Sequence, residues 1–221
     1  MAAEALILDF GGVITRTLFE THARTEHVLG LAPGTLTWRG PFDAAGDVLW
    51  RTMQENRISE RDYWHRRTAE VAALVGADWT EMADFVRAVR GADPEAAIRP
   101  EALAAIATAK AAGKRLAILS NELDLFYDAA FRRQLPWLAD FEGIHDSTHT
   151  GILKPDAAAY CDCLATLGLP AEACVFVDDQ PRNVAGADAV GLRTVAFDVR
   201  RPAAGFDRAL KLLGLKEFSN A

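Results

Sequence analysis

The strongest constraint on this chain is a short apolar run, Ala5–Leu8, that ends in Asp9 and is followed by Gly11 and Gly12. A continuous apolar run bounded by a turn signal is typical of a buried strand in a parallel sheet. Glycines let the backbone turn sharply and approach a bound group. We therefore expect Asp9 at the carboxyl end of a strand, where open α/β sheets bind ligands. An aspartate can also cap a turn or helix, so Asp9 alone does not decide between these roles.

Three further apolar runs predict strands at residues 115–120, 173–178 and 194–197. Two of them end in polar pairs, Ser120–Asn121 and Asp178–Asp179. Helical patterns separate these runs, and strand–helix alternation is typical of parallel sheets covered on both faces. The predicted fold class is α/β, with a doubly wound, Rossmann-like parallel sheet.

Residues 16–99 show helical patterns and no convincing strand. Ser59 can cap one of these helices. We expect this stretch to form an inserted α-helical cap subdomain, and residues 1–15 and 100–221 to form the α/β core. The stretch 136–151 is expected to be irregular.

The composition excludes several classes of protein. A net charge of −7 over 221 residues argues against binding to nucleic acid or to an anionic membrane surface. No apolar stretch approaches the ~20 residues that span a bilayer, and no signal peptide is evident. Three cysteines, expected to be reduced and buried, do not suggest a disulfide framework. We expect a cytoplasmic protein, either a monomer or a homodimer.

The polar strand ends predict a site. A parallel sheet gathers Asp9, Asp178 and Asp179 at one edge, where three carboxylates repel one another unless a cation lies between them. Lys154 is one candidate cation, and a divalent ion is the other. Oxygen ligands without histidine or cysteine favour Mg²⁺. Such a site suits phosphoryl chemistry on a small-molecule phosphorylated substrate.

Four motifs occur in a characteristic order. They are Asp9–Val13, Ser120–Asn121, Lys154–Asp156 and Asp178–Ala187. Together they resemble the motifs of the haloacid dehalogenase-like hydrolase superfamily, and the segment from Leu49 to Trp64 is similar to helical caps of its first subfamily. Each motif alone is weak, but four in order are a strong signal.

The resemblance implies roles for individual residues. Asp9 would be the nucleophile that forms an aspartyl-phosphate, and Lys154 would stabilise it. Ser120 would hydrogen-bond the phosphoryl group together with Asn121, Lys154 and Gly12.

The resemblance also implies a Mg²⁺ site. Asp9, the Gly11 carbonyl and Asp179 would hold the ion, while Asp178 would act mainly through a bound water. Asn183 would help to order the loop that carries the two aspartates.

One position departs from the pattern of the family's phosphatases. Many carry a second aspartate two residues after the nucleophile, as an acid and base, and Gly11 stands there in this chain. Loss of general acid–base catalysis typically costs about 10²–10⁴-fold in rate. We therefore expect a preference for good leaving groups, such as aryl or anomeric sugar phosphates, and a long-lived phospho-Asp9.

Two other functions stay open. A 2-haloacid dehalogenase would use Asp9 to attack carbon, and halide needs no proton to leave, but the pair Asp178–Asp179 would oppose an anionic substrate. A non-catalytic protein that binds phosphate ligands is the third interpretation. His145 or His149 could replace the missing proton carrier, although structural hydrogen bonds are the more common role of loop histidines.

Overall fold

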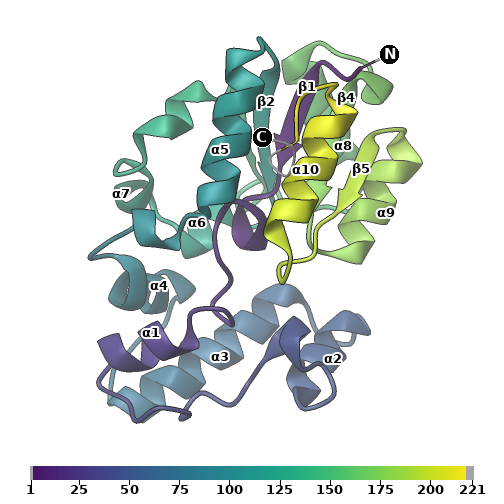
Figure 1. The fold of residues 1–221 in the computed structure, drawn as a ribbon. Coiled ribbons are helices and arrows are strands. Elements are labelled where there is room, and N and C mark those ends of the chain that lie inside the picture. Colours follow the sequence, from purple (N-terminus) through teal and green to yellow (C-terminus); the bar gives the residue numbers. More distant parts are fainter. Residues whose placement is uncertain (1, 218–221) are drawn as a thin grey trace.

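The computed structural model describes residues 2–217 (Figure 1). In this part of the chain, five parallel strands form one sheet in the order β3-β2-β1-β4-β5. Their bounds are β1 (Ala5–Leu8), β2 (Arg115–Ser120), β3 (Gly143–Asp146), β4 (Cys174–Asp178) and β5 (Arg193–Ala196). The predicted α/β fold with a doubly wound parallel sheet is confirmed.

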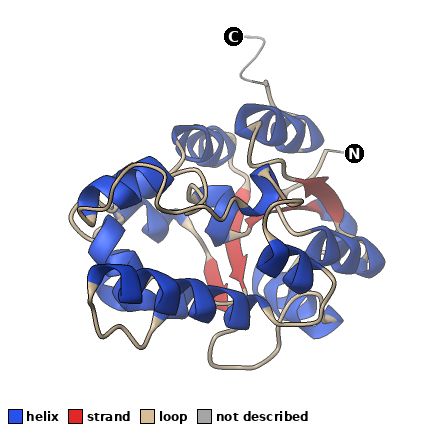
Figure 2. Cartoon of the chain, turned by 90° about the horizontal axis from the view of Figure 1, so that it is seen from below, coloured by secondary structure: helices blue, strands red, loops and turns tan. Residues whose placement is uncertain are grey.

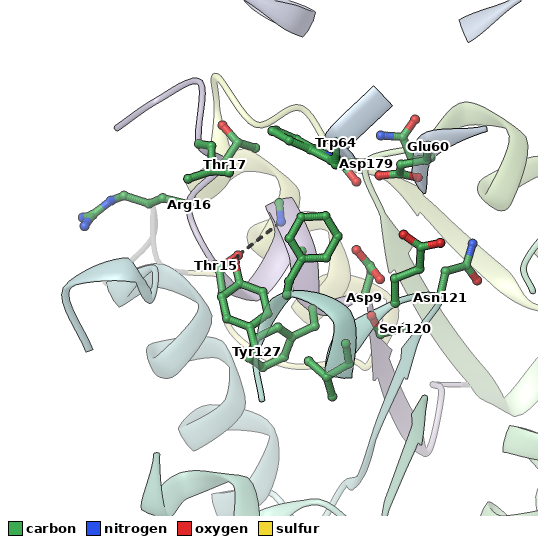
Figure 3. A pocket seen from close by; sticks show the side chains of 18 of the residues that line it. Asp9, Thr15, Arg16, Thr17, Glu60, Trp64, Ser120, Asn121, Tyr127 and Asp179 are labelled. Atoms are coloured by element: carbon green, nitrogen blue, oxygen red, sulfur yellow. Dashed lines mark hydrogen bonds between the residues drawn. The ribbon is translucent and has the colours of Figure 1, made fainter. Parts of the chain in front are cut away.

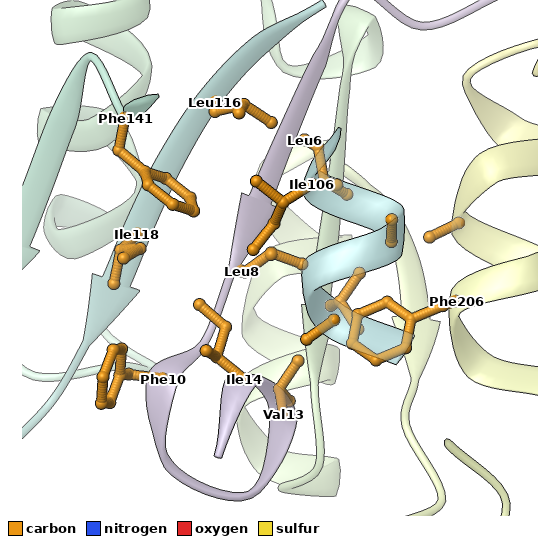
Figure 4. Close-up of a cluster of buried hydrophobic side chains, with 14 of the residues drawn as sticks. Leu6, Leu8, Phe10, Val13, Ile14, Ile106, Leu116, Ile118, Phe141 and Phe206 are labelled. Atoms are coloured by element: carbon orange, nitrogen blue, oxygen red, sulfur yellow. The ribbon is translucent and has the colours of Figure 1, made fainter. Parts of the chain in front are cut away.

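Helices cover both faces of the sheet because side chains alternate along each strand. Leu6 and Leu8 of β1 pack on one face with α5 (Pro100–Ala111) and α10 (Pro202–Leu212), and Figure 4 shows part of this cluster. Ala5 and Ile7 pack on the other face with α8 (Ala157–Leu167) and α9 (Pro181–Val190). The strands are thus buried on both sides, which explains their unbroken apolar runs.

Four α-helices lie within residues 16–99, between β1 and α5. They are α1 (His22–Val28), α2 (Val48–Gln54), α3 (Glu60–Val75) and α4 (Met82–Arg90). Figure 1 draws them below the sheet, and Figure 2 shows the helices around the strands from that side. We call residues 16–99 the helical insertion. Its role as a separate cap domain, with the core in residues 1–15 and 100–221, stays a prediction.

Local sequence explains the ends of several helices. The Ser59 side chain accepts a hydrogen bond from the amide of Asp62, and the Asp62 carboxylate accepts one from the amide of Ser59. This reciprocal capping box starts α3, so the predicted cap at Ser59 is confirmed. The Asp156 side chain caps α8 by accepting a hydrogen bond from the amide of Ala158, and Gly168 ends that helix with a φ of 57°.

The structure corrects three expectations. Strand β3 lies within 136–151, which was predicted to be irregular. A helix expected near 125–133 is split into α6 (Leu123–Phe126) and α7 (Ala129–Arg132), because Asp128 caps a new turn through the amide of Phe131. Cys163 and Cys174 are buried, but Cys161 is exposed, and none of these three forms a disulfide within residues 2–217.

No helix in the described residues, 2–217, is long and apolar enough to cross a membrane.

Candidate functional site

Three aspartates meet at the carboxyl ends of two neighbouring strands. Asp9 follows β1, Asp178 ends β4, and Asp179 follows it. One carboxylate oxygen from each lies within 4.8 Å of the other two. Metal-bound oxygens around Mg²⁺ lie at about 2.0–2.1 Å from the ion, so a modest tightening of this cluster would fit one ion. Asp9 and Asp179 therefore lie close together, as predicted.

Lys154 is the cation that the structure places among these acids. Its Nζ donates to Asp9 Oδ1, Asp178 Oδ2 and the carbonyl of Leu119, each at 2.7 Å. The side chain is 1% exposed. One ammonium can balance only one of three carboxylates, so the cluster fits a further, divalent cation.

Asp178 is held more firmly than the other two acids. Its Oδ1 accepts a hydrogen bond from the amide of Gln180, and both of its oxygens accept from Nδ2 of Asn183. With Lys154 also on Oδ2, most of the accepting capacity of Asp178 is used inside the protein. Asn183 thus holds the loop that carries the aspartates, and Asp178 fits an indirect role at a metal.

Burial changes the acidity of the site. Loss of solvent raises the pKa of Asp9 to about 7, although the Lys154 ammonium beside it acts in the opposite direction. Burial, together with the charges of Asp178 and Asp9, raises the pKa of Asp179 well above its usual range. Both shifts have the same leading cause, the loss of solvent around a charged carboxylate, and the neighbouring carboxylates add to it. A bound cation would favour the ionised carboxylates.

The two glycines after Asp9 have different structural roles. Gly12 has a φ of +83°, and a Cβ placed there would lie 2.7 Å from Asp179 Oδ2. Gly12 thus lets the Asp179 carboxylate approach the loop. Gly11 has ordinary backbone angles (φ −73°, ψ 122°), and a Cβ there would meet no atom within 4 Å. A Cβ at position 11 would therefore meet no neighbouring atom.

Ser120 and Asn121 follow β2 at the same edge (Figure 3). Ser120 is nearly buried and lines the pocket beside Asp9. The side chain of Asn121 is bonded to Lys154, because its Oδ1 accepts from the Lys154 amide at 2.7 Å and its Nδ2 donates to the Lys154 carbonyl at 3.0 Å. Asn121 therefore positions Lys154, a contact that the sequence did not reveal.

Arg99 is a residue that the sequence analysis missed. Its side chain is 2% exposed and donates to the Gly12 carbonyl from Nε (3.2 Å) and Nη2 (3.0 Å). The same guanidinium makes two bonds to the Glu20 carboxylate, at 2.7 and 2.6 Å. Thr15 and Ile98 also pair across the ends of the helical insertion. Arg99 thus joins the loop after Asp9 to the start of the insertion.

A pocket opens above the acids and holds about 830 Å³ of space, its open mouth included. Asp9, Ser120, Lys154 and Asp179 line one end. The opposite wall comes from the helical insertion and from α6, and Figure 3 shows Trp64 and Glu60 on this side. Pockets of this size hold small molecules.

His145 and His149 lie away from these residues. His149 contacts Asp124 at 3.1 Å and is largely exposed. His145 is on β3, where burial lowers its pKa. Neither lines the pocket, so the structure gives no support to either one as a substitute proton carrier.

Comparison with known proteins agrees with this arrangement. Residues 3–191 match the family model for haloacid dehalogenase-like hydrolases. The chain is 32% identical over 204 residues to a plasmid-borne protein CbbY of Cupriavidus necator, which covers 87% of the chain and 77% of that protein. It is 26% identical over 191 residues to the sesquiterpene phosphatase astK of Aspergillus oryzae, covering 86% of the chain and 87% of that protein.

A solved structure shows the same fold. The L-2-haloacid dehalogenase of Xanthobacter autotrophicus aligns with a TM-score of 0.58 at 20% identity, covering 91% of this chain and 81% of that one. At this identity the likeness concerns the fold and leaves the choice between phosphate and halide chemistry to the site.

Proposed function

Since the chain belongs to the haloacid dehalogenase-like hydrolases, we propose that it is a Mg²⁺-dependent hydrolase of small-molecule phosphate monoesters. The observation that carries this proposal is the cluster of three carboxylates within 4.8 Å beside a single buried lysine. That excess of negative charge suits a metal and a phosphate group together. The similarity to a sesquiterpene phosphatase agrees with it.

In the proposed reaction, a carboxylate oxygen of Asp9 attacks phosphorus. The new oxygen–phosphorus bond forms as the bond to the ester oxygen breaks, and the ester oxygen leaves and takes a proton from water. A second water then attacks phosphorus, breaks its bond to Asp9 and releases inorganic phosphate. Lys154, already 2.7 Å from Asp9, orients the nucleophile and offsets the charge of the phosphoryl group.

Other residues of the pocket would bind the phosphoryl oxygens. The Ser120 hydroxyl and the backbone amides of Gly12 and Asn121 are the candidate donors. The side-chain amide of Asn121 holds Lys154 instead, as described above. Arg99 would keep the Gly12 backbone in place during turnover.

Asp9, the Gly11 carbonyl and Asp179 are the residues that would hold Mg²⁺, with Asp178 behind them. When bound, the ion would offset the charge of the acids and of the substrate phosphate. We further propose that the helical insertion acts as a cap, because it supplies one wall of the pocket and excludes water when a substrate fills it.

Gly11 defines the proposed limits of this activity. No side chain at position 11 can protonate the ester oxygen, so esters of acidic alcohols and phenols should react fastest. The same feature is compatible with dehalogenation of a 2-haloacid, which we keep as the second candidate. It is also compatible with a protein that binds phosphate ligands without turnover.

One panel of assays separates these functions. Phosphate release from aryl phosphates and halide release from 2-chloropropionate are measured with Mg²⁺ and with EDTA. We expect phosphate release that EDTA abolishes, and its loss in Asp9→Asn, while Asp162→Asn on the exposed side of α8 serves as the matched control. Halide release that survives EDTA would support the dehalogenase, and ligand-induced thermal stabilisation without turnover would support the binding protein.

A further inference from the structure

The pocket has two chemically different ends. The end with Asp9, Ser120 and Lys154 is polar and charged. The other end is an apolar wall, which we define as the six residues Leu18, Phe19, Trp50, Trp64, Leu123 and Phe126. A phosphate held beside Asp9 would direct its ester group toward the remaining space, along this wall.

Aromatic rings of the apolar wall support one another. Phe19 meets Trp50 edge to face with centroids 5.2 Å apart, and its ring is 5.3 Å from that of Trp64. Trp64 meets Phe126 at 5.8 Å and 90°. Because Trp64 belongs to α3 and Phe126 to α6, the wall spans the helical insertion and the core. Interlocked rings of this kind present a preformed apolar surface.

Most polar side chains around the wall have partners in the protein. Glu60 pairs with Arg182 at 3.0 Å. Glu122 pairs with Arg61 at 2.9 Å through one oxygen, while its second oxygen is buried without a hydrogen-bond partner. Gln180 accepts from Gln54 at 3.2 Å.

The same holds on the opposite side of the pocket. Arg90 donates to the hydroxyl of Tyr127 at 2.6 Å and to the carbonyl of Arg16 at 2.7 Å. Arg16 in turn donates to Ala96, and Thr17 donates to Glu20. A sugar would give up hydrogen bonds to water here, and each one that is not replaced costs about 1–3 kcal/mol.

From these contacts we propose that the group esterified to the phosphate is an apolar hydrocarbon, alkyl or aromatic, and that a polyhydroxylated sugar is disfavoured. This inference rests on the proposed function for the phosphate end of the pocket. The apolar wall would hold the hydrocarbon by removing it from water, which is worth about 25 cal/mol per Å² of buried apolar surface. The wall thus determines specificity and takes no part in bond breaking.

The test uses straight-chain alkylphosphonates from methyl to octyl with Mg²⁺, because they bind without being hydrolysed. Each added methylene should lower Kd two- to fourfold until the wall is covered. In parallel, kcat/KM is measured for ethyl, butyl and hexyl phosphate, whose leaving groups have nearly equal pKa, and for ribose 5-phosphate. We expect the same rise with chain length and a lower value for the sugar phosphate.

A matched pair of variants identifies the surface. Phe126 and Trp137 are both partly buried aromatic residues packed against the same core cluster, but only Phe126 lines the pocket. Phe126→Gln should reduce the ratio between the Kd of methylphosphonate and the Kd of octylphosphonate at least fivefold. Trp137→Gln should leave this ratio as it is in the wild type. Two results would overturn the proposal: a Kd that does not change with chain length in the wild type, or an equal loss of the chain-length dependence in Trp137→Gln.

Failure of the proposed function gives a different result. If no ester releases phosphate, the hydrolase proposal is wrong, yet the phosphonate series still shows whether the wall binds hydrocarbon. If phosphate is released and ribose 5-phosphate is the better substrate, the hydrolase proposal stands and the apolar wall has been misassigned.

Discussion

A carboxyl group introduced at position 11 should restore the acid that the site lacks. Gly11 has φ −73° and ψ 122°, which any L-residue adopts, and a Cβ there meets nothing within 4 Å. Gly11→Asp is therefore free of steric strain, and the melting temperature should stay near that of the wild type. The acids Asp9, Asp178 and Asp179 lie nearby, and their negative charge would raise the pKa of the introduced carboxyl. A raised pKa favours the protonated form that can donate a proton to the ester oxygen.

The expected gain depends on the leaving group. General acid catalysis is worth about 10²–10⁴-fold, or roughly 2.7–5.4 kcal/mol of activation free energy at 1.36 kcal/mol per decade. An aryl phosphate, whose leaving oxygen needs little protonation, should gain the least. An alkyl phosphate should approach the full factor.

The assay is kcat/KM as a function of leaving-group pKa for the wild type, Gly11→Asp and the isosteric Gly11→Asn, because kcat/KM reports the step in which the leaving group departs. The wild type should show a steep dependence and Gly11→Asp a shallow one, because the proton is supplied as the bond breaks. Equal slopes for the wild type and Gly11→Asp, or an equal gain from Gly11→Asn, would refute the reasoning.

Three further predictions concern binding and stability. Gly12→Ala should weaken Mg²⁺ binding at least tenfold in a thermal-shift titration, because its Cβ would lie 2.7 Å from Asp179 Oδ2 at a φ of +83°; unchanged binding would contradict this. Arg99→Met should lower the free energy of unfolding by about 3 kcal/mol in urea, since it leaves the Glu20 carboxylate and a buried carbonyl without their partner, and a loss below about 1 kcal/mol would count against the pair. Burial lowers the pKa of His22 from about 6.5 to about 4, so the unfolded chain binds the extra proton and stability falls as pH drops from 6.5 to 4, by about 2 kcal/mol at pH 5. His22→Phe should remove that part of the pH dependence in urea unfolding at pH 5 and 7.5, and an unaltered fall would exclude His22 as its source.

Much of the fold could be predicted because burial on two faces produces a visible pattern. Strands β1, β2, β4 and β5 were anticipated at nearly their observed bounds for this reason. Strand β3 (Gly143–Asp146) was missed because it is short, lies at the edge of the sheet and carries polar residues on partly exposed positions. Edge strands need less apolar surface, so periodicity identifies them poorly.

Some residues of the candidate site could be predicted from the sequence, and others could not. The acids Asp9 and Asp179 were predicted because polar residues at strand ends meet at one edge of a parallel sheet. Lys154 was predicted as a cation between the acids and from its resemblance to a family motif. The sequence did not predict the hydrogen bonds from Arg99 to the Gly12 carbonyl. These two residues are 87 positions apart, and only the folded chain brings them together. Nor could the sequence show that Asn121 supports Lys154.

The most direct test of the account is to trap the intermediate on Asp9. The wild-type protein is mixed with Mg²⁺ and an aryl phosphate, quenched in acid, and digested for mass spectrometry. We predict one added phosphoryl group on the peptide that contains Asp9, absent in Asp9→Asn and absent with EDTA. Phosphate release with no such adduct at any time, or an adduct that persists in Asp9→Asn, would contradict the claim that Asp9 is the nucleophile.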